Sequence, residues 1–140
     1  MSTIYLISAS ATSAQDFFEK LKEDNPDIII DIRLKNTSQL CGFTKKNDLS
    51  YLIHEILHKP YVHDTHFAPQ ESLLNAYLHH EISSDEYLQC YEETLNKDQL
   101  LSLFKKDYGA YKKIALISAQ TPTRPSHAQV LARLLIDKEK

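Results

Sequence analysis

Four short apolar runs alternate with segments of helical periodicity, and this alternation most constrains the fold of the chain. The runs are rich in β-branched residues, and the longer ones are apolar on both faces, which is typical of strands in a parallel sheet covered on both sides. The expected strands are Thr3–Ser8, Asp27–Ile32, Pro60–Asp64 and Lys113–Ser118. Because parallel strands are joined by crossover helices, the sequence predicts an α/β domain in three layers, with a mainly parallel sheet of about four strands flanked by helices.

Helical patterns fill the intervals between these runs. Ser13 and Ser83 each precede an acidic residue three positions on, a pattern that caps helix N-termini. A helix from about Asp48 must end at Lys59, because the next residue is proline. The remaining helices are expected after Pro69, over Leu100–Phe104 following a break at Asn96, and from near Ser126.

Size and composition indicate one domain spanning 1–140 and exclude several classes. With 140 residues, 42% of them hydrophobic, the chain can bury its own core. The glycines, Gly42 and Gly109, are too few for a Gly-rich phosphate loop, and Cys41 and Cys90 form no CxxC pair and indicate a reducing compartment. Because no membrane-spanning run or signal-peptide pattern occurs, we expect a cytoplasmic location. The net charge of −3 argues against nucleic-acid binding.

The ends of the four expected strands are all polar. They are Ser8–Ser10, Asp31–Arg33, His63–His66 and Ser118–Gln120. Ligands of open α/β sheets bind beyond the carboxyl ends of the strands, where the strand order reverses, so we expect a polar crevice at that edge. The ligand-binding residues expected there are Ser8, Ser10, Arg33, His63, Ser118, Arg124 and Ser126.

Asp31 and Arg33 flank Ile32 at the end of the second strand, so their side chains should emerge on the same side. A carboxylate at this place can accept a proton, anchor a ligand or hold a guanidinium group. A salt bridge that only positions Arg33 is an equally good interpretation. The sequence leaves both open.

The segment 118–127 joins the last strand to the last helix through two prolines. The free N–H groups at the start of that helix can hold an anion, assisted by Arg124, and Ser126 or a neighbouring residue is the expected cap. His127 lies on the apolar face of the helix, three residues before Val130, so its imidazole should point toward the core or the crevice. A hydrogen-bonded core histidine is the alternative to an acid/base role.

His54 to His58 match the HExxH pattern of zinc hydrolases, in which two histidines on a helix bind the metal and Glu55 acts as the general base. However, both histidines should project away from the apolar stripe around Ile53, and Lys59 would repel a dication. A solvated amphipathic helix is therefore preferred, and no metal ligands are assigned. A zinc hydrolase remains one alternative function.

A partner-binding module or homodimer is another alternative. Tyr77, Tyr108 and Tyr111 lie on or next to expected helices, and exposed tyrosines would be suitable interface anchors.

Several short motifs, in their order and spacing from Ile4 to Leu135, resemble the bacterial family called domain of unknown function 488. They are Ile4-Tyr5 with Ser10, Asp31-Ile32-Arg33, Tyr61-Val62-His63, Phe67-Ala68-Pro69, Glu86-Tyr87 with Tyr91, and Ser126-His127-Ala128 with Val130-Leu131 and Leu134-Leu135. The resemblance implies the α/β fold but no reaction or cofactor. Many members carry a cysteine after the last strand and Cys-His-Arg at the last helix, where this chain has Ser118 and Ser126-His127-Ala128, as in a branch with His-Ala. A thiol role is therefore not carried over.

Together, these features predict a crevice that binds a small anionic ligand, such as a nucleotide or a phosphorylated metabolite. Arg33 and Arg124 would contact the anion. Asp31 would serve as a base or polar anchor and His127 as an acid/base group or hydrogen-bond donor, which makes these two the candidate catalytic residues. The sequence does not decide whether the protein is an enzyme or which cofactor it uses.

Overall fold

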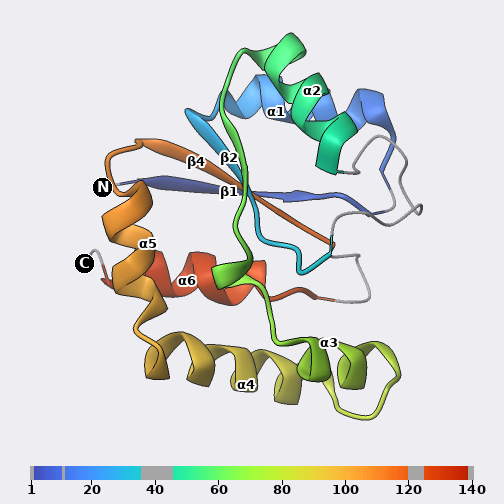
Figure 1. The fold of residues 1–140 in the computed structure, drawn as a ribbon, viewed down its shortest axis with the longest axis vertical. Helices are drawn as coiled ribbons and strands as arrows, with labels where there is room; N and C mark the ends of the chain where they lie inside the picture. Colours follow the sequence, from blue (N-terminus) through green and yellow to red (C-terminus); the bar gives the residue numbers. More distant parts are fainter. Residues whose placement is uncertain (1, 11, 36–45, 120–124, 139–140) are drawn as a thin grey trace.

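Four parallel strands form one sheet at the centre of the protein (Figure 1). The computed structural model describes residues 2–10, 12–35, 46–119 and 125–138. The strands are β1 (Thr3–Ser8), β2 (Ile28–Asp31), β3 (Tyr61–His63) and β4 (Lys113–Ser118), in the order β1-β4-β2-β3. Each neighbouring pair is parallel. The predicted α/β fold is confirmed, with β2 and β3 one residue shorter at each end than expected.

Six helices surround the sheet in the described part of the chain: α1 (Ala14–Asp24), α2 (Lys46–Leu57), α3 (Glu71–Leu78), α4 (Ser84–Lys97), α5 (Leu100–Tyr108) and α6 (Ala128–Lys138). A short 3-10 turn, Thr65–Phe67, follows β3. The hydroxyls of Ser13 and Ser83 cap α1 and α4 as predicted, each accepting a hydrogen bond from the N–H three residues on. None of the described helices is long and apolar enough to cross a membrane.

The break between α4 and α5 falls later than predicted. Asn96 lies inside α4, and the chain turns instead at Gln99, which adopts a left-handed conformation with φ of 55°. Asparagine is only one of several polar residues in this stretch, so the pattern alone did not locate the turn. After it, α5 continues beyond Phe104 to Tyr108.

The two faces of the sheet carry separate cores. Ile29 and Ile117 face α1 and α2 on one side, whereas Ile30 and Leu116 face α5 and α6 on the other, because successive side chains of a strand alternate. All four residues of β2 are buried for this reason. Helices α3 and α4 form an additional tier on the outer side of α6 (Figure 1).

The order of the strands leads to a crevice at the edge where the carboxyl ends of the strands lie. All carboxyl ends of the strands lie at the same edge, because all strands are parallel. β4 lies between β1 and β2, yet the helix that follows it packs on the face opposite to the helices that follow its two neighbours (Figure 1). Neighbouring chain exits therefore diverge around the end of β4, which is where a crevice is expected.

Candidate functional site

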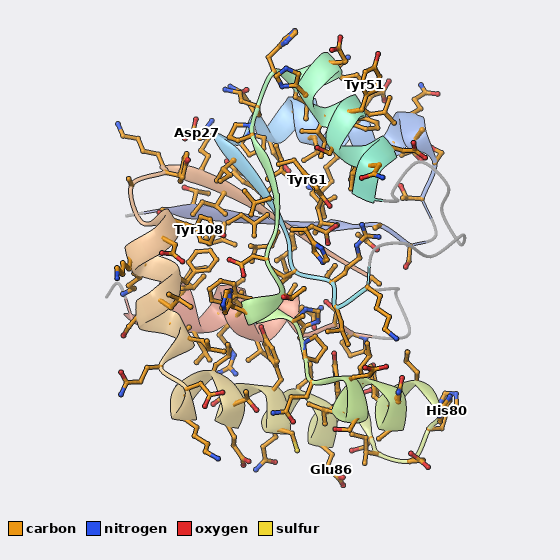
Figure 2. The ribbon with its side chains drawn as sticks, in the orientation of Figure 1. Asp27, Tyr51, Tyr61, His80, Glu86 and Tyr108 are labelled. Atoms are coloured by element: carbon orange, nitrogen blue, oxygen red, sulfur yellow. The ribbon has the colours of Figure 1, made fainter. Side chains whose placement is uncertain are left out.

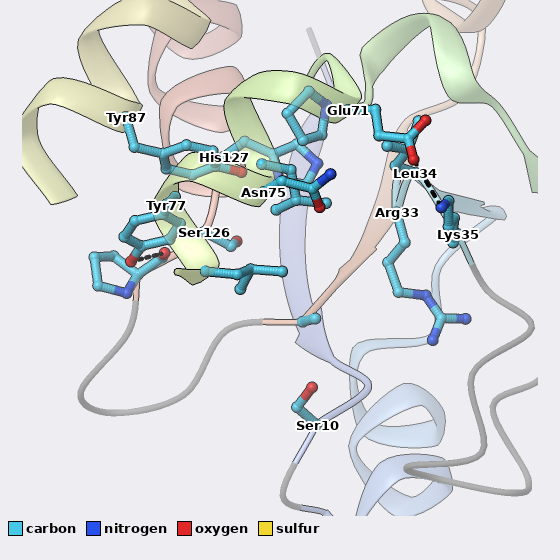
Figure 3. A pocket seen from close by; sticks show the side chains of 15 residues that line it. Ser10, Arg33, Leu34, Lys35, Glu71, Asn75, Tyr77, Tyr87, Ser126 and His127 are labelled. Carbon is cyan, nitrogen blue, oxygen red and sulfur yellow. Dashed lines mark hydrogen bonds and ion pairs between the residues drawn. The ribbon is translucent and has the colours of Figure 1, made fainter. Parts of the chain in front are cut away.

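A cavity of about 280 Å³ occupies this edge, between the strand exits and the α3–α4 tier (Figure 3). Its volume is just below the range of about 300 to 1,000 Å³ that is usual for small-molecule pockets. The lining residues come from the exits of β1, β2 and β4 and from α3, α4 and the start of α6: Ser10, Arg33, Leu34, Lys35, Pro69, Glu71, Leu74, Asn75, Tyr77, Leu78, Tyr87, Ala119, Pro125, Ser126 and His127. The structure thus brings the exit of β2 and the start of α6 to one cavity.

Four of the residues expected at the crevice line the cavity, namely Ser10, Arg33, Ser126 and His127. Four others, Ser8, Asp31, His63 and Ser118, are the last residues of the four strands but are not part of the lining. Arg124 lies outside the described residues.

Asp31 and Arg33 form a bidentate ion pair. Nε and the terminal nitrogen Nη2 of Arg33 donate to the two carboxylate oxygens over 2.9 and 2.7 Å, and Tyr61 donates its hydroxyl over 2.6 Å. Asp31 is fully buried, which by itself would raise its pKa, but the hydrogen bonds and charge of Arg33 outweigh burial and lower the pKa. The carboxylate is therefore ionised and fixes the direction of the guanidinium.

Two histidines hold the backbone that carries Arg33. His127 Nε2 lies 2.7 Å from the carbonyl oxygen of Ile32, and His63 Nε2 lies 2.7 Å from the carbonyl oxygen of Arg33. A carbonyl oxygen can only accept, so both rings must carry their proton on Nε2. The two rings thus hold consecutive carbonyl groups of the β2 exit, His127 from the turn before α6 and His63 from β3.

His127 is held in its neutral form. The ring is only 5% exposed, and it packs edge-on against Tyr91 with 5.0 Å between ring centroids. Burial lowers the pKa of His127 to about 4, against the smaller opposing effects of the Ile32 hydrogen bond and the Asp31 charge. With Nε2 protonated, Nδ1 of this neutral ring is a hydrogen-bond acceptor.

Serine pairs shape the turns after β1 and β4. Ser126 Oγ donates to Ser118 Oγ over 3.0 Å and accepts the N–H of Ala128, so it caps α6 as predicted. Ser8 Oγ accepts the N–H of Ser10 over 3.1 Å. Ser8 and Ser118 therefore support the turns that place Ser10 and Ser126 at the cavity.

Sequence reasoning missed the wall that α3 and α4 contribute. Tyr77 and Tyr87 stack with centroids 4.1 Å apart, and Tyr77 donates its hydroxyl to the carbonyl of Pro125 over 2.9 Å. At the rim, Lys35 Nζ and Glu71 Oε1 form an ion pair of 2.9 Å (Figure 3). The apolar spacing of α3 was visible in the sequence, but nothing there placed that helix opposite the β2 exit.

The polar segment after β3 has a structural role. Asp64, which follows β3, caps the 3-10 turn through the N–H of His66 and accepts the hydroxyl of Tyr108 over 2.5 Å. Burial opposes its ionisation, but the hydrogen bonds from Tyr108 and His66 lower the pKa of Asp64. Figure 2 shows Tyr108 directed inward from α5.

The zinc-hydrolase and homodimer alternatives rest on residues that lie in very different surroundings. His54 and His58 are exposed, as the helical wheel predicted, and His58 lies beyond the end of α2 with φ of 56°. Among the described residues, no group of three or more histidine, cysteine or acidic side chains is placed to hold a metal ion. Tyr77 and Tyr108 are buried and hydrogen-bonded, so these two are not exposed anchors for a dimer interface. Tyr111 is half-buried and packs against the core.

A comparison with known families matched most of the chain. The family described as Domain of unknown function DUF488 matches residues 13–135, which confirms the resemblance seen in the motifs. No curated protein and no solved structure matched the chain.

Proposed function

The chain belongs to the family described as Domain of unknown function DUF488, and from this premise we propose that it binds a small organic anion at the carboxyl edge of its sheet. The class includes nucleotides and phosphorylated metabolites. The observation that carries the proposal is the convergence of Arg33, Ser10, Ser126 and His127 on a mainly apolar cavity of about 280 Å³.

Each part of the lining has a role in the proposal. The guanidinium of Arg33 recognises the anionic group, because a guanidinium is suited to carboxylates and phosphates. Ser10 adds a hydroxyl, and Nδ1 of His127 accepts a hydrogen bond from the ligand. The organic part of the ligand packs against Leu74, Leu78 and the Tyr77–Tyr87 pair.

Within this proposal Asp31 is a positioning residue. Its two oxygens are engaged by Arg33 and Tyr61, and its pKa is lowered, which favours an anchor over a proton acceptor. Of the two candidate catalytic residues, Asp31 and His127, neutral His127 is then the one that would touch the ligand.

A thermal-shift screen tests the proposal. Nucleoside monophosphates, sugar phosphates and small carboxylates are compared, since a ligand at a hundred times its Kd stabilises a protein by about 2.7 kcal/mol. The test variant is Asn75→Trp, which adds bulk at an exposed position of the cavity lining without touching the core, and so should block the ligand. Stabilisation that is lost in this variant supports the proposal, whereas stabilisation by no compound, or equal stabilisation of both proteins, rejects it.

A further inference from the structure

We propose that Glu71 filters the ligands of this cavity by charge, so that organic monoanions bind in preference to dianions of the same shape. The inference rests on the proposed function and narrows its class of ligand: carboxylates and phosphodiesters, with one negative charge, are favoured over phosphate monoesters, which carry nearly two negative charges at neutral pH. It concerns the rim of the cavity, where Glu71 pairs with Lys35 (Figure 3).

The first step is the charge of the lining. Within the described residues, both cations of the lining are paired with carboxylates, Arg33 with Asp31 and Lys35 with Glu71. The positive potential that an incoming anion meets is therefore largely offset. One negative charge can still be matched by the N–H donors of these cations, but a second charge adds repulsion from the two carboxylates.

The second step is the difference between the two pairs. The side chains of Asp31 and Arg33 are 0% and 10% exposed, whereas those of Lys35 and Glu71 are 68% and 60% exposed. Exposed ion pairs are weak, so a bound anion can draw Lys35 away from its partner. Glu71 then stays beside the ligand as an uncompensated charge, and its repulsion grows with the charge of the ligand.

The third step is the apolar wall. Leu74 and Leu78 on α3 and the stacked tyrosines accept an uncharged organic body. Burial of that body does not depend on the ionic group, so two ligands with one body and different charge isolate the effect of Glu71.

The probes are 1-naphthalenesulfonate, a monoanion, and 1-naphthyl phosphate, a dianion of similar shape above its second ionisation near a pKa of about 6. Their affinities are measured by calorimetry at low ionic strength. We expect the protein to bind the sulfonate about tenfold more tightly than the phosphate. Glu71→Gln should remove most of this preference by strengthening phosphate binding.

Glu55→Gln is the matched control, because Glu55 is exposed on α2, across the sheet from the cavity, and the substitution changes the net charge equally. Loss of the preference in Glu71→Gln but not in Glu55→Gln supports the inference. If both probes bind and Glu71→Gln shifts the two affinities equally, the charge filter is rejected and the proposed function stands. If neither probe binds any of the three proteins, the charge filter is rejected, and the thermal-shift screen alone decides the proposed function.

Discussion

His127 at the start of α6 donates its Nε2 proton to the backbone carbonyl of Ile32, at a distance of 2.7 Å and across 95 residues of sequence. This bond joins the last helix to the exit of the second strand, on the residue between Asp31 and Arg33. The same exit is held from the other side by His63, which donates to the next carbonyl. The direction of Arg33 is thus fixed by its own ion pair and by two backbone bonds.

Removal of the His127 ring should strongly destabilise the fold. His127→Ala opens a cavity in the core and leaves the Ile32 carbonyl without its donor, for an expected loss of about 3 kcal/mol in the free energy of unfolding. His63→Ala, at a half-buried position, should cost only about 1 kcal/mol. Urea denaturation of both variants provides the measurement, and equal losses would show that burial of His127 contributes nothing extra.

The stability of the protein should fall as the pH falls from about 6.5 to about 4. His127 stays neutral in the folded state because its pKa is lowered from 6.5 to about 4, whereas the unfolded chain takes up a proton in this range. The unfolded state therefore binds more protons, and the loss is on the order of 3 kcal/mol, levelling off below the folded pKa. Denaturant midpoints across this range should fall for the parent and less steeply for His127→Gln; parallel curves would contradict the assignment.

Breaking the ion pair of Asp31 should cost more than removing its third hydrogen bond. Asp31→Asn leaves the guanidinium of Arg33 without its counter-charge in a site where the side chain is 10% exposed, for an expected loss of about 3 kcal/mol. Tyr61→Phe removes one neutral donor and should cost about 1 kcal/mol. The pKa of Asp31 is lowered in the folded state. Its contribution to the free energy of unfolding is therefore fully present above the unfolded pKa and is lost as the pH falls through the folded pKa. The effect of Asp31→Asn should accordingly shrink in acid.

A double-mutant cycle checks this prediction. Asp31→Asn combined with Arg33→Gln should be less destabilised than the sum of the two single variants, because the second change removes the unpaired charge. Additive losses would show that the pair does not act as a unit.

Arg124 should strengthen anion binding. It lies outside the described residues, but it directly precedes Pro125, which lines the cavity, and the sequence predicts that it contacts the anionic group of the ligand. Arg124→Gln should weaken 1-naphthalenesulfonate binding by about tenfold at low salt and by less at high salt. An unchanged Kd in calorimetry would remove Arg124 from the proposed site.

Zinc should not stabilise the protein. His54 and His58 are exposed, and His58 has left the helix, so the i, i+4 geometry of a zinc helix is absent from this stretch of the described chain. The melting temperature should be the same with added zinc and with a chelator. A zinc-dependent rise that His54→Ala abolishes would restore the hydrolase interpretation.

Local pattern explains why much of the fold was predictable. β1 and β4 begin and end where their apolar runs do, and the serine caps of α1 and α4 lie at the predicted residues. The meeting of Asp31–Arg33 with His127 followed from a single rule, that the carboxyl ends of parallel strands share an edge.

Contacts that depend on strand order and register could not be predicted in this way. Tyr61 reaches Asp31 because β3 pairs with β2 in a register that sets Asp31 beside His63. The wall of the cavity depends on α3 lying across the β2 exit, which brings Glu71 to Lys35. Such placements arise from packing between elements far apart in the sequence. Hydrophobic periodicity describes single elements and gives no information about this packing.

An amide NMR titration with 1-naphthalenesulfonate tests the central claim most directly, since it reports every residue that a ligand approaches. We expect the largest shifts at Ser10, Arg33, Asn75 and His127, from four separate segments that meet only at the cavity. Shifts concentrated on α2, around exposed Tyr51 (Figure 2), or an absence of saturable shifts would contradict a ligand site at the carboxyl edge of the sheet.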